Sequence, residues 1–206
     1  MTEALLFDLG GVIMDIDRMR AVRAFEELGM PDADAFFDPY RQRGILGDLE
    51  AGQISEKEFL DAVRPMFTRP VTDGEIVNGL CRFLIGIPAE RLERLKALRA
   101  AGYRVGLLSN TNPIMWNAFI LPEFMKLGGD ISDYFDDVVT SFEAGCCKPD
   151  PVIFNLALER MAITPGETTF YDDGRGNLQE AARLGLHTEL VDNADPARSF
   201  MTLNRL

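Results

Sequence analysis

Apolar and amphipathic segments alternate along the chain from about residue 102 onward. Four short apolar runs predict strands, at residues 103–109, 137–142, 168–173 and 187–192. Helical spacing in the intervals predicts helices at residues 113–127, 151–161 and 177–184. Strands that alternate with helices are typical of a parallel sheet covered by helices, so this half of the chain predicts an α/β fold.

A further strand is predicted near the beginning of the chain, in the sequence LLFDLGG of residues 5–11. This apolar run ends on a carboxylate, Asp8, and turns at once through Gly10 and Gly11. The carboxyl end of a buried strand is where α/β folds bind ligands. Asp8 is therefore a candidate nucleophile or metal ligand.

Residues 16–88 follow a different pattern, with helical periodicity and little strand signal. Ser55 and Glu58 have the spacing of a capping box at the start of one of these helices. We expect residues 1–15 and 89–206 to form an α/β core domain, with residues 16–88 as a helical cap inserted after the first strand. A cap in that place lies over the carboxyl end of the sheet and can close a site there against water.

Composition and charge limit the classes of function. A chain of 206 residues with 47% hydrophobic content can bury one good core, or one core and a small second domain. Its 33 acidic and 21 basic residues give a formal charge of -12, which argues against nucleic-acid and membrane partners. Because no apolar run approaches the roughly 20 residues that span a bilayer and no signal-peptide pattern is present, we expect a cytoplasmic protein.

Cysteine and histidine offer little chemistry. The three cysteines, Cys81, Cys146 and Cys147, form neither a disulfide framework nor a metal-ligand spacing. Lys148 beside the adjacent pair could lower a thiol pKa, although small loop residues are the more ordinary interpretation. His187 is the only histidine, so a zinc site or a Ser-His triad has almost nothing to be built from.

Polar groups follow four of the predicted strands. They are Asp8 with Gly10 and Gly11, the run Ser109, Asn110, Thr111 and Asn112, then Lys148, and finally Asp172 with Asp173. The carboxyl ends of parallel strands lie on one edge of a sheet, so these groups should converge. Backbone N–H groups and a hydroxyl in the second group can hold an anionic oxygen. The two adjacent aspartates repel unless a cation or a shared proton offsets their charges.

These residues resemble the haloacid dehalogenase (HAD) superfamily of aspartate-nucleophile hydrolases, and in the branch nearest to this chain the strand ends look like FDLG, LSNT, KP and DD. The resemblance covers nearly the whole chain and is nearest to small-cap sugar-phosphate phosphatases, the branch that includes the α-D-glucose-1-phosphate phosphatase type and the phosphatase domain of mammalian epoxide hydrolase. It implies a Rossmann-like parallel sheet with a small helical cap. The implied partner is a small phosphorylated metabolite, preferably a sugar phosphate, and the chain would be a monomer or a homodimer.

Carried over to this sequence, the resemblance makes Asp8 the nucleophile that accepts the phosphoryl group as an aspartyl-phosphate. Ser109, the backbone of Asn110 and Gly11 would bind the substrate phosphate. Lys148 would neutralise charge on the nucleophile and on the group being transferred. Mg²⁺ would sit opposite them.

The implied magnesium ligands are Asp173, Asp8 and the carbonyl of Gly10, with Asp172 and Asn177 supporting from the periphery of the metal. Mg²⁺ prefers hard oxygen ligands and is commonly held by one or two carboxylates together with phosphate and water. Together with Lys148, such an ion lets the anionic Asp8 approach an anionic phosphate.

One position departs from the family pattern. Most phosphatases of the family carry a second aspartate two residues after the nucleophile as an acid-base group, and here that place is Gly10. Loss of a positioned acid-base group costs roughly 10² to 10⁴ in rate. Asp15 and Asp17 are possible substitutes, although solvated residues at a helix entry are the more ordinary interpretation. Arg41 and Arg43 could meet an anionic substrate, against the simpler interpretation of surface salt bridges.

Two other functions stay open. A 2-haloacid dehalogenase also uses an aspartate nucleophile without the second aspartate, but it needs no metal and no pair of carboxylates opposite Asp8. A chain that keeps the fold and the metal site but lacks catalysis would instead bind a phosphate ligand or a protein. Only the absence of a side chain at Gly10 suggests this third possibility.

Overall fold

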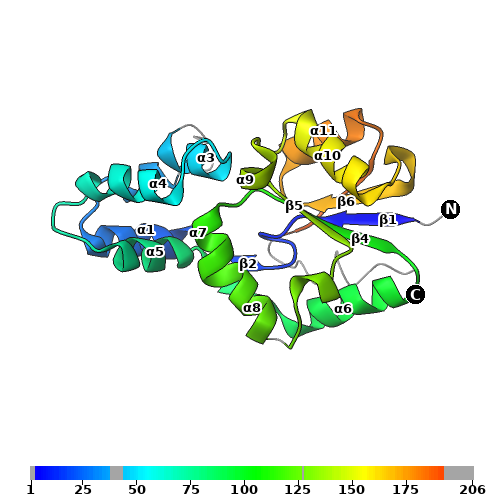
Figure 1. The fold of residues 1–206 in the computed structure, drawn as a ribbon, viewed down its shortest axis with the longest axis horizontal. Helices are drawn as coiled ribbons and strands as arrows, with labels where there is room; N and C mark the ends of the chain where they lie inside the picture. Colours follow the sequence, from blue (N-terminus) through cyan, green and yellow to red (C-terminus); the bar gives the residue numbers. More distant parts are fainter. Residues whose placement is uncertain (1–2, 38–43, 127, 193–206) are drawn as a thin grey trace.

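The computed structural model describes residues 3–37, 44–126 and 128–192, and its centre is a five-stranded parallel sheet (Figure 1). The strands follow the order β5-β4-β1-β6-β7 across the sheet. Their bounds are β1 Ala4–Phe7, β4 Arg104–Ser109, β5 Asp137–Thr140, β6 Thr168–Asp172 and β7 His187–Leu190. The five strands predicted from the sequence are therefore those of the sheet. Arg41 and Arg43 lie outside the described residues.

The central strand, β1, is buried on both faces. Leu5 and Phe7 belong to the hydrophobic cluster on one side of the sheet and Leu6 to the cluster on the other. This alternation follows from the two-residue period of a strand. Because helices cover both faces, the strand reads as a continuous apolar run, as parallel strands do.

Helices form a layer on each side of the sheet (Figure 1). One layer contains α6 Ala89–Ala100 and α8 Leu121–Lys126, and the other contains α10 Pro151–Met161 and α11 Arg175–Arg183. Shorter elements complete the core: α7 Pro113–Met115, η2 Trp116–Ile120, η3 Ile131–Asp133, α9 Ser141–Ala144 and η4 Pro165–Glu167. Pro151 occupies the first turn of α10, where its missing N–H costs nothing.

The segment between β1 and α6 is mostly helical and lies beyond the carboxyl ends of the sheet strands (Figure 1). Its elements are β2 Asp15–Ile16, α1 Arg18–Leu28, α2 Ala33–Phe36, α3 Ile45–Glu50, α4 Glu56–Val63, η1 Arg64–Met66, α5 Asp73–Cys81 and β3 Leu84–Gly86. We call residues 17–83 the cap segment. The predicted capping box of Ser55 and Glu58 is confirmed at the start of α4.

Aromatic side chains fill the interior of the cap segment. Phe25 lies 4.9 Å from Phe37 and 5.4 Å from Phe67, measured between ring centroids. Phe25 and Phe59 belong to the same hydrophobic cluster as Leu5 and other residues of the sheet. The cap segment therefore packs as a continuation of the core on the α6 side of the sheet.

Several element boundaries differ from the sequence prediction. The strand predicted at residues 137–142 ends at Thr140, and the helix predicted at 113–127 is interrupted by the π-helical turn η2. Pro122 explains the interruption, because it has no N–H for an ordinary helical bond and the turn before it widens. The antiparallel pair β2 and β3 was not predicted either, since it is short and carries little strand signal.

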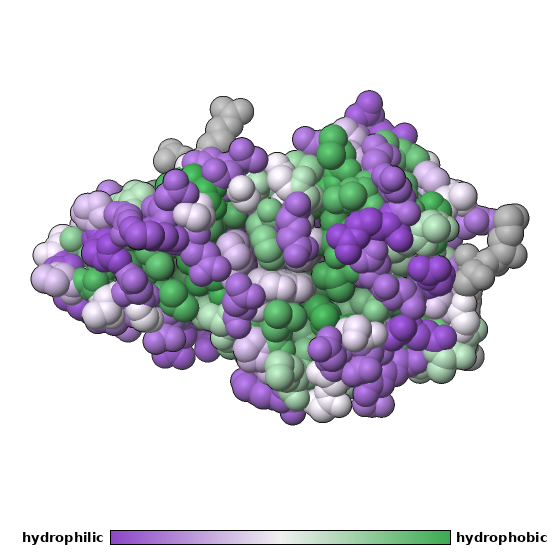
Figure 2. All heavy atoms as spheres, in the orientation of Figure 1, coloured by the Kyte–Doolittle hydropathy of each residue, from purple (hydrophilic) through white to green (hydrophobic). Residues whose placement is uncertain are grey.

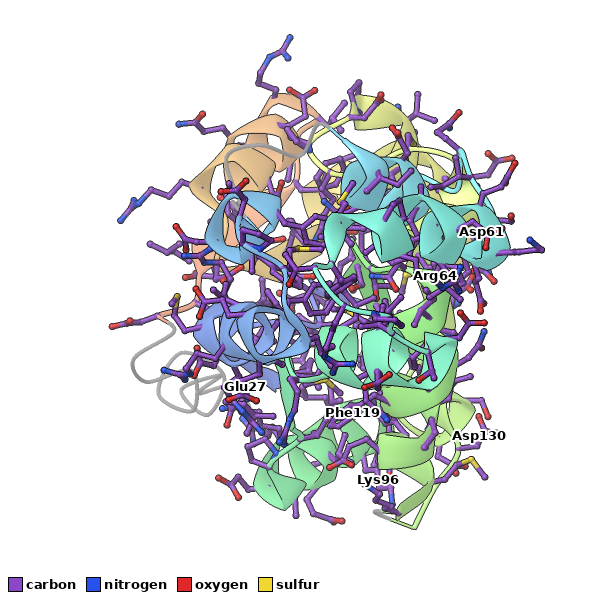
Figure 3. All side chains as sticks on the ribbon, turned by 90° about the vertical axis from the view of Figure 1, so that its left-hand side faces the viewer. Glu27, Asp61, Arg64, Lys96, Phe119 and Asp130 are labelled. Carbon is purple, nitrogen blue, oxygen red and sulfur yellow. The ribbon has the colours of Figure 1, made fainter. Side chains whose placement is uncertain are left out.

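The outer surface is predominantly polar. Figure 2 shows hydrophilic residues over most of one face, with apolar surface in separated areas. Seen from the cap end, Asp61 and Arg64 lie on the exterior, with Arg64 Nη1 3.0 Å from an Asp61 oxygen (Figure 3). None of the helices within the described residues has the length and apolar character needed to cross a bilayer.

Candidate active site

Asp8 lies at the carboxyl end of β1, where its backbone and side chain are both held. Its N–H donates to the carbonyl of Tyr171 at 2.9 Å, which extends the pairing of β1 with β6 by one residue. Its Oδ1 accepts the N–H of Leu9 at 2.7 Å. The residue is only 9% exposed, so the carboxylate is fixed at the edge of the sheet within a largely dry environment.

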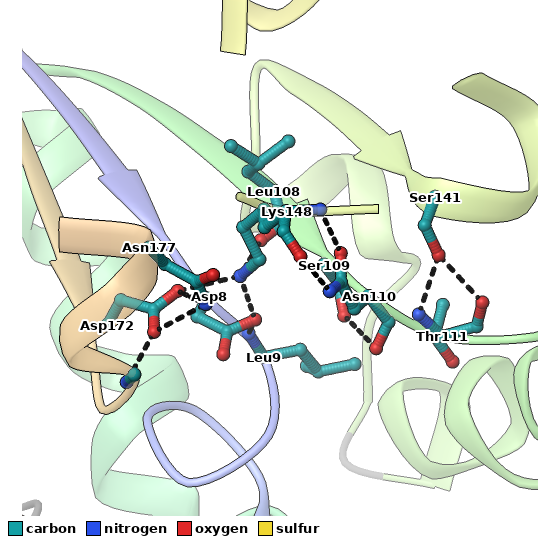
Figure 4. A network of polar contacts seen from close by, with 11 residues as sticks. Asp8, Leu9, Leu108, Ser109, Asn110, Thr111, Ser141, Lys148, Asp172 and Asn177 are labelled. Carbon is teal, nitrogen blue, oxygen red and sulfur yellow. Dashed lines mark hydrogen bonds and ion pairs between the residues drawn. The ribbon is translucent and has the colours of Figure 1, made fainter. Parts of the chain in front are cut away.

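Lys148 connects the nucleophile candidate to the second carboxylate (Figure 4). Its Nζ lies 2.8 Å from Asp8 Oδ1 and 2.7 Å from Asp172 Oδ2, and it donates to the carbonyl of Leu108 at 2.9 Å. An ammonium has three protons, and these three acceptors can use all of them. The side chain is 1% exposed, so the cation is committed to this network.

Asp172 is completely buried at the end of β6 and is held from three directions. Besides Lys148, it accepts the N–H of Gly174 at 2.6 Å and the side-chain amide of Asn177 at 3.0 and 3.1 Å (Figure 4). A Cβ at Gly174 would stand 2.8 Å from Asn177 Nδ2 and 2.9 Å from Asp172 Oδ1. The glycine is therefore needed for this close approach, and α11 begins at Arg175, earlier than its predicted start at Asn177.

Two loops beside Asp8 are locked together. The side chain of Asn110 donates to the carbonyl of Lys148 at 2.9 Å and accepts its N–H at 2.8 Å. Ser141 Oγ accepts the N–H of Thr111 at 3.0 Å and donates to its carbonyl at 2.9 Å. Ser109, at the end of β4, is 2% exposed. The predicted phosphate loop thus lies next to the lysine, and Ser141, which the sequence placed in a strand, is its brace.

Three carboxylates and a lysine lie close together in this site. Asp8, Asp172 and Asp173 each offer a carboxylate oxygen within a group whose members all lie within 4.8 Å of one another. Burial raises the pKa of Asp8 to about 7, although Lys148 acts in the opposite direction. Burial alone would lower the pKa of Lys148, but Asp172 and Asp8 outweigh it, so the lysine stays protonated. Three carboxylates facing one lysine provide the hard oxygen ligands and excess negative charge that fit Mg²⁺.

The loop after Asp8 gives Gly10 and Gly11 different surroundings. Gly11 has a positive φ of 74°, and its N–H donates to the carbonyl of Met14 at 2.8 Å. This N–H group is therefore already used and does not make the contact with the substrate phosphate that was expected of Gly11. A Cβ at Gly10 would only touch Ile16, at 3.6 Å, so the backbone does not exclude a side chain there.

The two aspartates considered as acid-base substitutes have structural partners. Asp15 pairs with Arg91 at 2.8 Å, and Arg91 also donates to the carbonyl of Ile13 at 3.0 Å. Asp17 caps α1 by accepting the N–H of Met19 at 2.9 Å. Both contacts favour the interpretation of these residues as helix-entry and loop anchors.

The cysteines next to Lys148 are not activated. Burial raises the pKa of the Cys147 thiol to about 11, and the nearby charge of Glu50 adds to the rise. Lys148 acts in the opposite direction but is the weakest influence. The pKa of Cys146 is raised by burial as well, so neither thiol becomes the reactive thiolate that the basic neighbour suggested.

Glu50, at the end of α3, is a carboxyl close to Cys147 that the sequence did not indicate. Burial raises the pKa of its carboxyl to about 7. No sequence signal could have found it, because its neighbourhood is created by contact between the cap segment and the loop before Lys148.

The family model for haloacid dehalogenase-like hydrolases matches residues 2–185. The chain belongs to this family. A D-ribitol-5-phosphate phosphatase of Bacteroides thetaiotaomicron is 37% identical over 203 residues, which cover 98% of each chain. A predicted HAD-like family hydrolase of Porphyromonas gingivalis has a similar structure, with a TM-score of 0.89 at 34% identity over 100% of this chain and 99% of the other.

A third relative has been crystallised with ligands. A HAD family enzyme of Bacteroides thetaiotaomicron, crystallised in complex with magnesium and inorganic phosphate, has a TM-score of 0.87 at 35% identity over 94% of this chain and 96% of that chain. The expected family and its Rossmann-like fold are confirmed by these matches, and the chain is a hydrolase of the HAD-like family.

Proposed function

We propose that this HAD-like hydrolase is a Mg²⁺-dependent phosphomonoesterase that transfers the phosphoryl group of a small sugar or polyol phosphate to Asp8 and then to water. The observation that carries the proposal is the buried Lys148, which bridges Asp8 and Asp172 beside a third carboxylate. The similarity to the D-ribitol-5-phosphate phosphatase, 98% of whose length aligns with this chain, supports a sugar or polyol phosphate as the substrate.

Asp8, Asp173 and the carbonyl of Gly10 would hold the Mg²⁺, with Asp172 at its periphery. The three aspartates already place their oxygens within 4.8 Å of one another. The bound ion supplies positive charge that offsets the repulsion between a carboxylate nucleophile and a phosphate dianion. A dehalogenase would need no such cluster, so the carboxylate group favours the phosphatase over that alternative.

The protein residues divide the work of the transfer. Within the described residues, the contacts recorded at the Asp8 carboxylate fall on Oδ1, which leaves Oδ2 for attack on phosphorus. Lys148 stabilises negative charge on Asp8 before attack and on the phosphoryl oxygens during it. Ser109 and the backbone of Asn110 bind the phosphoryl oxygens from the opposite side.

The test is phosphate release from ribitol 5-phosphate, from sugar 1- and 6-phosphates and from p-nitrophenyl phosphate. We expect release with Mg²⁺, none with EDTA, and a loss of at least 10³-fold in Asp8→Asn, because a carboxamide is no nucleophile. Asp32→Asn, at an exposed position in the cap segment, is the matched control and should keep full activity.

Other outcomes point to the alternatives. Halide release from a 2-haloacid without metal would support a dehalogenase. Folded protein that binds Mg²⁺ but releases neither product, and forms no beryllofluoride adduct on Asp8, would support the binding protein.

A further inference from the structure

Glu50 stands where the cap segment meets the loop that carries Lys148. It is the last residue of α3, and α3 contacts α9, the helix that leads into that loop. The negative charge of Glu50 raises the pKa of the thiol of Cys147, the residue directly before Lys148. The carboxylate thus lies on the cap side of the loop that binds both Asn110 and Asp8.

A close backbone contact fixes this arrangement. Gly52 has a φ of 64°, and a Cβ there would stand 2.2 Å from the carbonyl oxygen of Phe142. The next residue, Gln53, donates from Nε2 to the carbonyl of Gly145 at 3.1 Å. Only glycine permits both this φ and this approach without strain. The segment after Glu50 is therefore docked on residues 142–145, which holds Glu50 next to the loop that leads to Lys148.

The carboxyl group of Glu50 is partly buried. Part of its surface is open to solvent, yet the surrounding protein desolvates it enough to raise its pKa to about 7. Among the described residues, no hydrogen bond or ion pair to its carboxylate is recorded. A desolvated carboxylate without a cation costs stability, and such groups are concentrated at functional sites.

Among the described residues, burial rather than a neighbouring charge raises the pKa of Glu50. Within the described residues, the titratable groups on the elements packed against α3 and on the loop after α9 are Glu56, Lys57, Glu58 and Asp61 of α4, Glu143 of α9, and Cys146, Cys147, Lys148 and Asp150 of the loop. Burial is the recorded cause of the raised pKa of Glu50. On α3 itself, the other carboxylate is Asp48, which is exposed.

We propose that Glu50 is the acid-base residue of this enzyme and performs from the cap segment the proton transfers for which Gly10 has no side chain. This inference rests on the proposed phosphatase function. It assigns a catalytic role to a carboxylate that lies outside the strand-end motifs. A carboxyl with a pKa near neutrality suits both giving and taking a proton at physiological pH.

Glu50 gives up a proton in the first step of the reaction and regains one in the second. Asp8 attacks phosphorus, the bond from phosphorus to the ester oxygen breaks, and the Glu50 carboxyl gives its proton to that oxygen, so that the alcohol leaves. In the second step the Glu50 carboxylate takes a proton from water as the water oxygen attacks the aspartyl-phosphate. The bond from phosphorus to Asp8 breaks, inorganic phosphate forms, and Glu50 is protonated again.

The experiment compares Glu50→Gln with the wild type in the presence of Mg²⁺. For sugar and alkyl phosphates, kcat should fall about 10²- to 10³-fold, and the alkaline limb of the rate profile near pH 7 should disappear. For p-nitrophenyl phosphate, whose leaving group needs no proton, the first step should stay fast and the second become slow. The variant should then release one equivalent of nitrophenolate in a burst, followed by slow turnover.

Three variants separate catalysis from structure. Asp48→Asn, an exposed carboxylate of the same helix, should behave as the wild type. Glu50→Asp should keep the alkaline limb with a reduced rate. Gly10→Asp, added to Glu50→Gln, should recover at least tenfold of the lost kcat, because a Cβ at Gly10 meets only Ile16, at 3.6 Å.

The outcomes distinguish this inference from the function on which it rests. A wild type that releases phosphate while Glu50→Gln keeps its kcat and pH profile overturns the role of Glu50 alone. So does a rise in KM without a change in kcat, which would make Glu50 a substrate-binding residue only. A wild type that releases no phosphate from any ester overturns both.

Discussion

The carboxyl edge of the sheet and the cap segment use charge in opposite ways. At the sheet edge, Lys148 and Asp172 are buried, and each meets its partners within 3 Å. In the cap segment, pairs such as Arg69 with Glu75 at 2.9 Å and Arg64 with Asp61 lie at the surface. Surface pairs contribute little to stability. The comparison shows that charge is a fixed part of the site at the sheet edge, whereas most cap charges are replaceable.

Glu50 is the cap residue that breaks this rule, and it compares directly with Asp8. Burial raises the pKa of both carboxyls to about 7. At Asp8 a buried lysine opposes the rise, while burial is the recorded cause at Glu50. Lys148 at the sheet edge therefore favours an anionic nucleophile, whereas the burial of Glu50 favours a carboxyl that can exchange a proton near neutral pH.

The strongest test of the buried network is Lys148→Met, which removes the charge and keeps a similar volume. Asp8 and Asp172 would then be buried without their cation, so the free energy of unfolding should fall by about 3 to 5 kcal/mol. Urea unfolding at pH 8 with EDTA measures this loss. It should shrink as the pH is lowered, because Asp8, whose pKa burial raises to about 7, becomes protonated.

Lys126→Met is the matched control for that variant. Lys126 pairs with Glu123 at 2.8 Å, but its side chain is 68% exposed. The loss should stay below about 1 kcal/mol. Equal losses in the two variants would contradict the distinction between buried and exposed charge.

Gly52→Ala tests whether the cap segment is docked by a backbone contact. Alanine at a φ of 64° should lower the free energy of unfolding by roughly 1 to 3 kcal/mol, and its Cβ would overlap the carbonyl of Phe142. Urea unfolding measures this loss, and limited proteolysis should cut the variant faster near residue 52. Gly74→Ala is the control, because no atom lies within 4 Å of its Cβ, and it should stabilise α5 slightly. Cleavage at wild-type rates in Gly52→Ala would speak against docking.

The sheet could be predicted from the sequence because its signals are local. Apolar runs marked the five strands, and the helix predicted at residues 151–161 is α10. The contacts among Asp8, Lys148 and Asp172 follow from one geometric fact, that parallel strands end on the same edge. Their assigned chemical roles remain predictions.

The missing parts depend on contacts between distant segments. Glu50 is positioned near Cys147 by the fit of Gly52 against Phe142, a contact between residues 90 positions apart that no periodicity reveals. The turn at Ser141 depends on its bonds to Thr111, because an apolar run alone does not mark where a strand gives way to a helix. Pro122 is visible in the sequence and marks the break before α8. The helical periodicity on both sides of this proline nevertheless led to the prediction of one continuous helix.

The smallest expected effect concerns the replaceable charges of the cap segment. Glu75 accepts the backbone N–H and the hydroxyl of Thr72 and pairs with Arg69, and these contacts lower the pKa of its carboxyl to about 2. Since its unfolded pKa is near 4.5, its stabilisation is fully present above pH 4.5 and is lost as the pH falls through about 2. Thermal unfolding should therefore give Glu75→Gln a lower Tm than the wild type at pH 7 and the same Tm near pH 2. Glu93→Gln, at an exposed position of α6, should match the wild type throughout. A Tm gap for Glu75→Gln that does not change with pH would place its effect in packing rather than in the carboxylate charge.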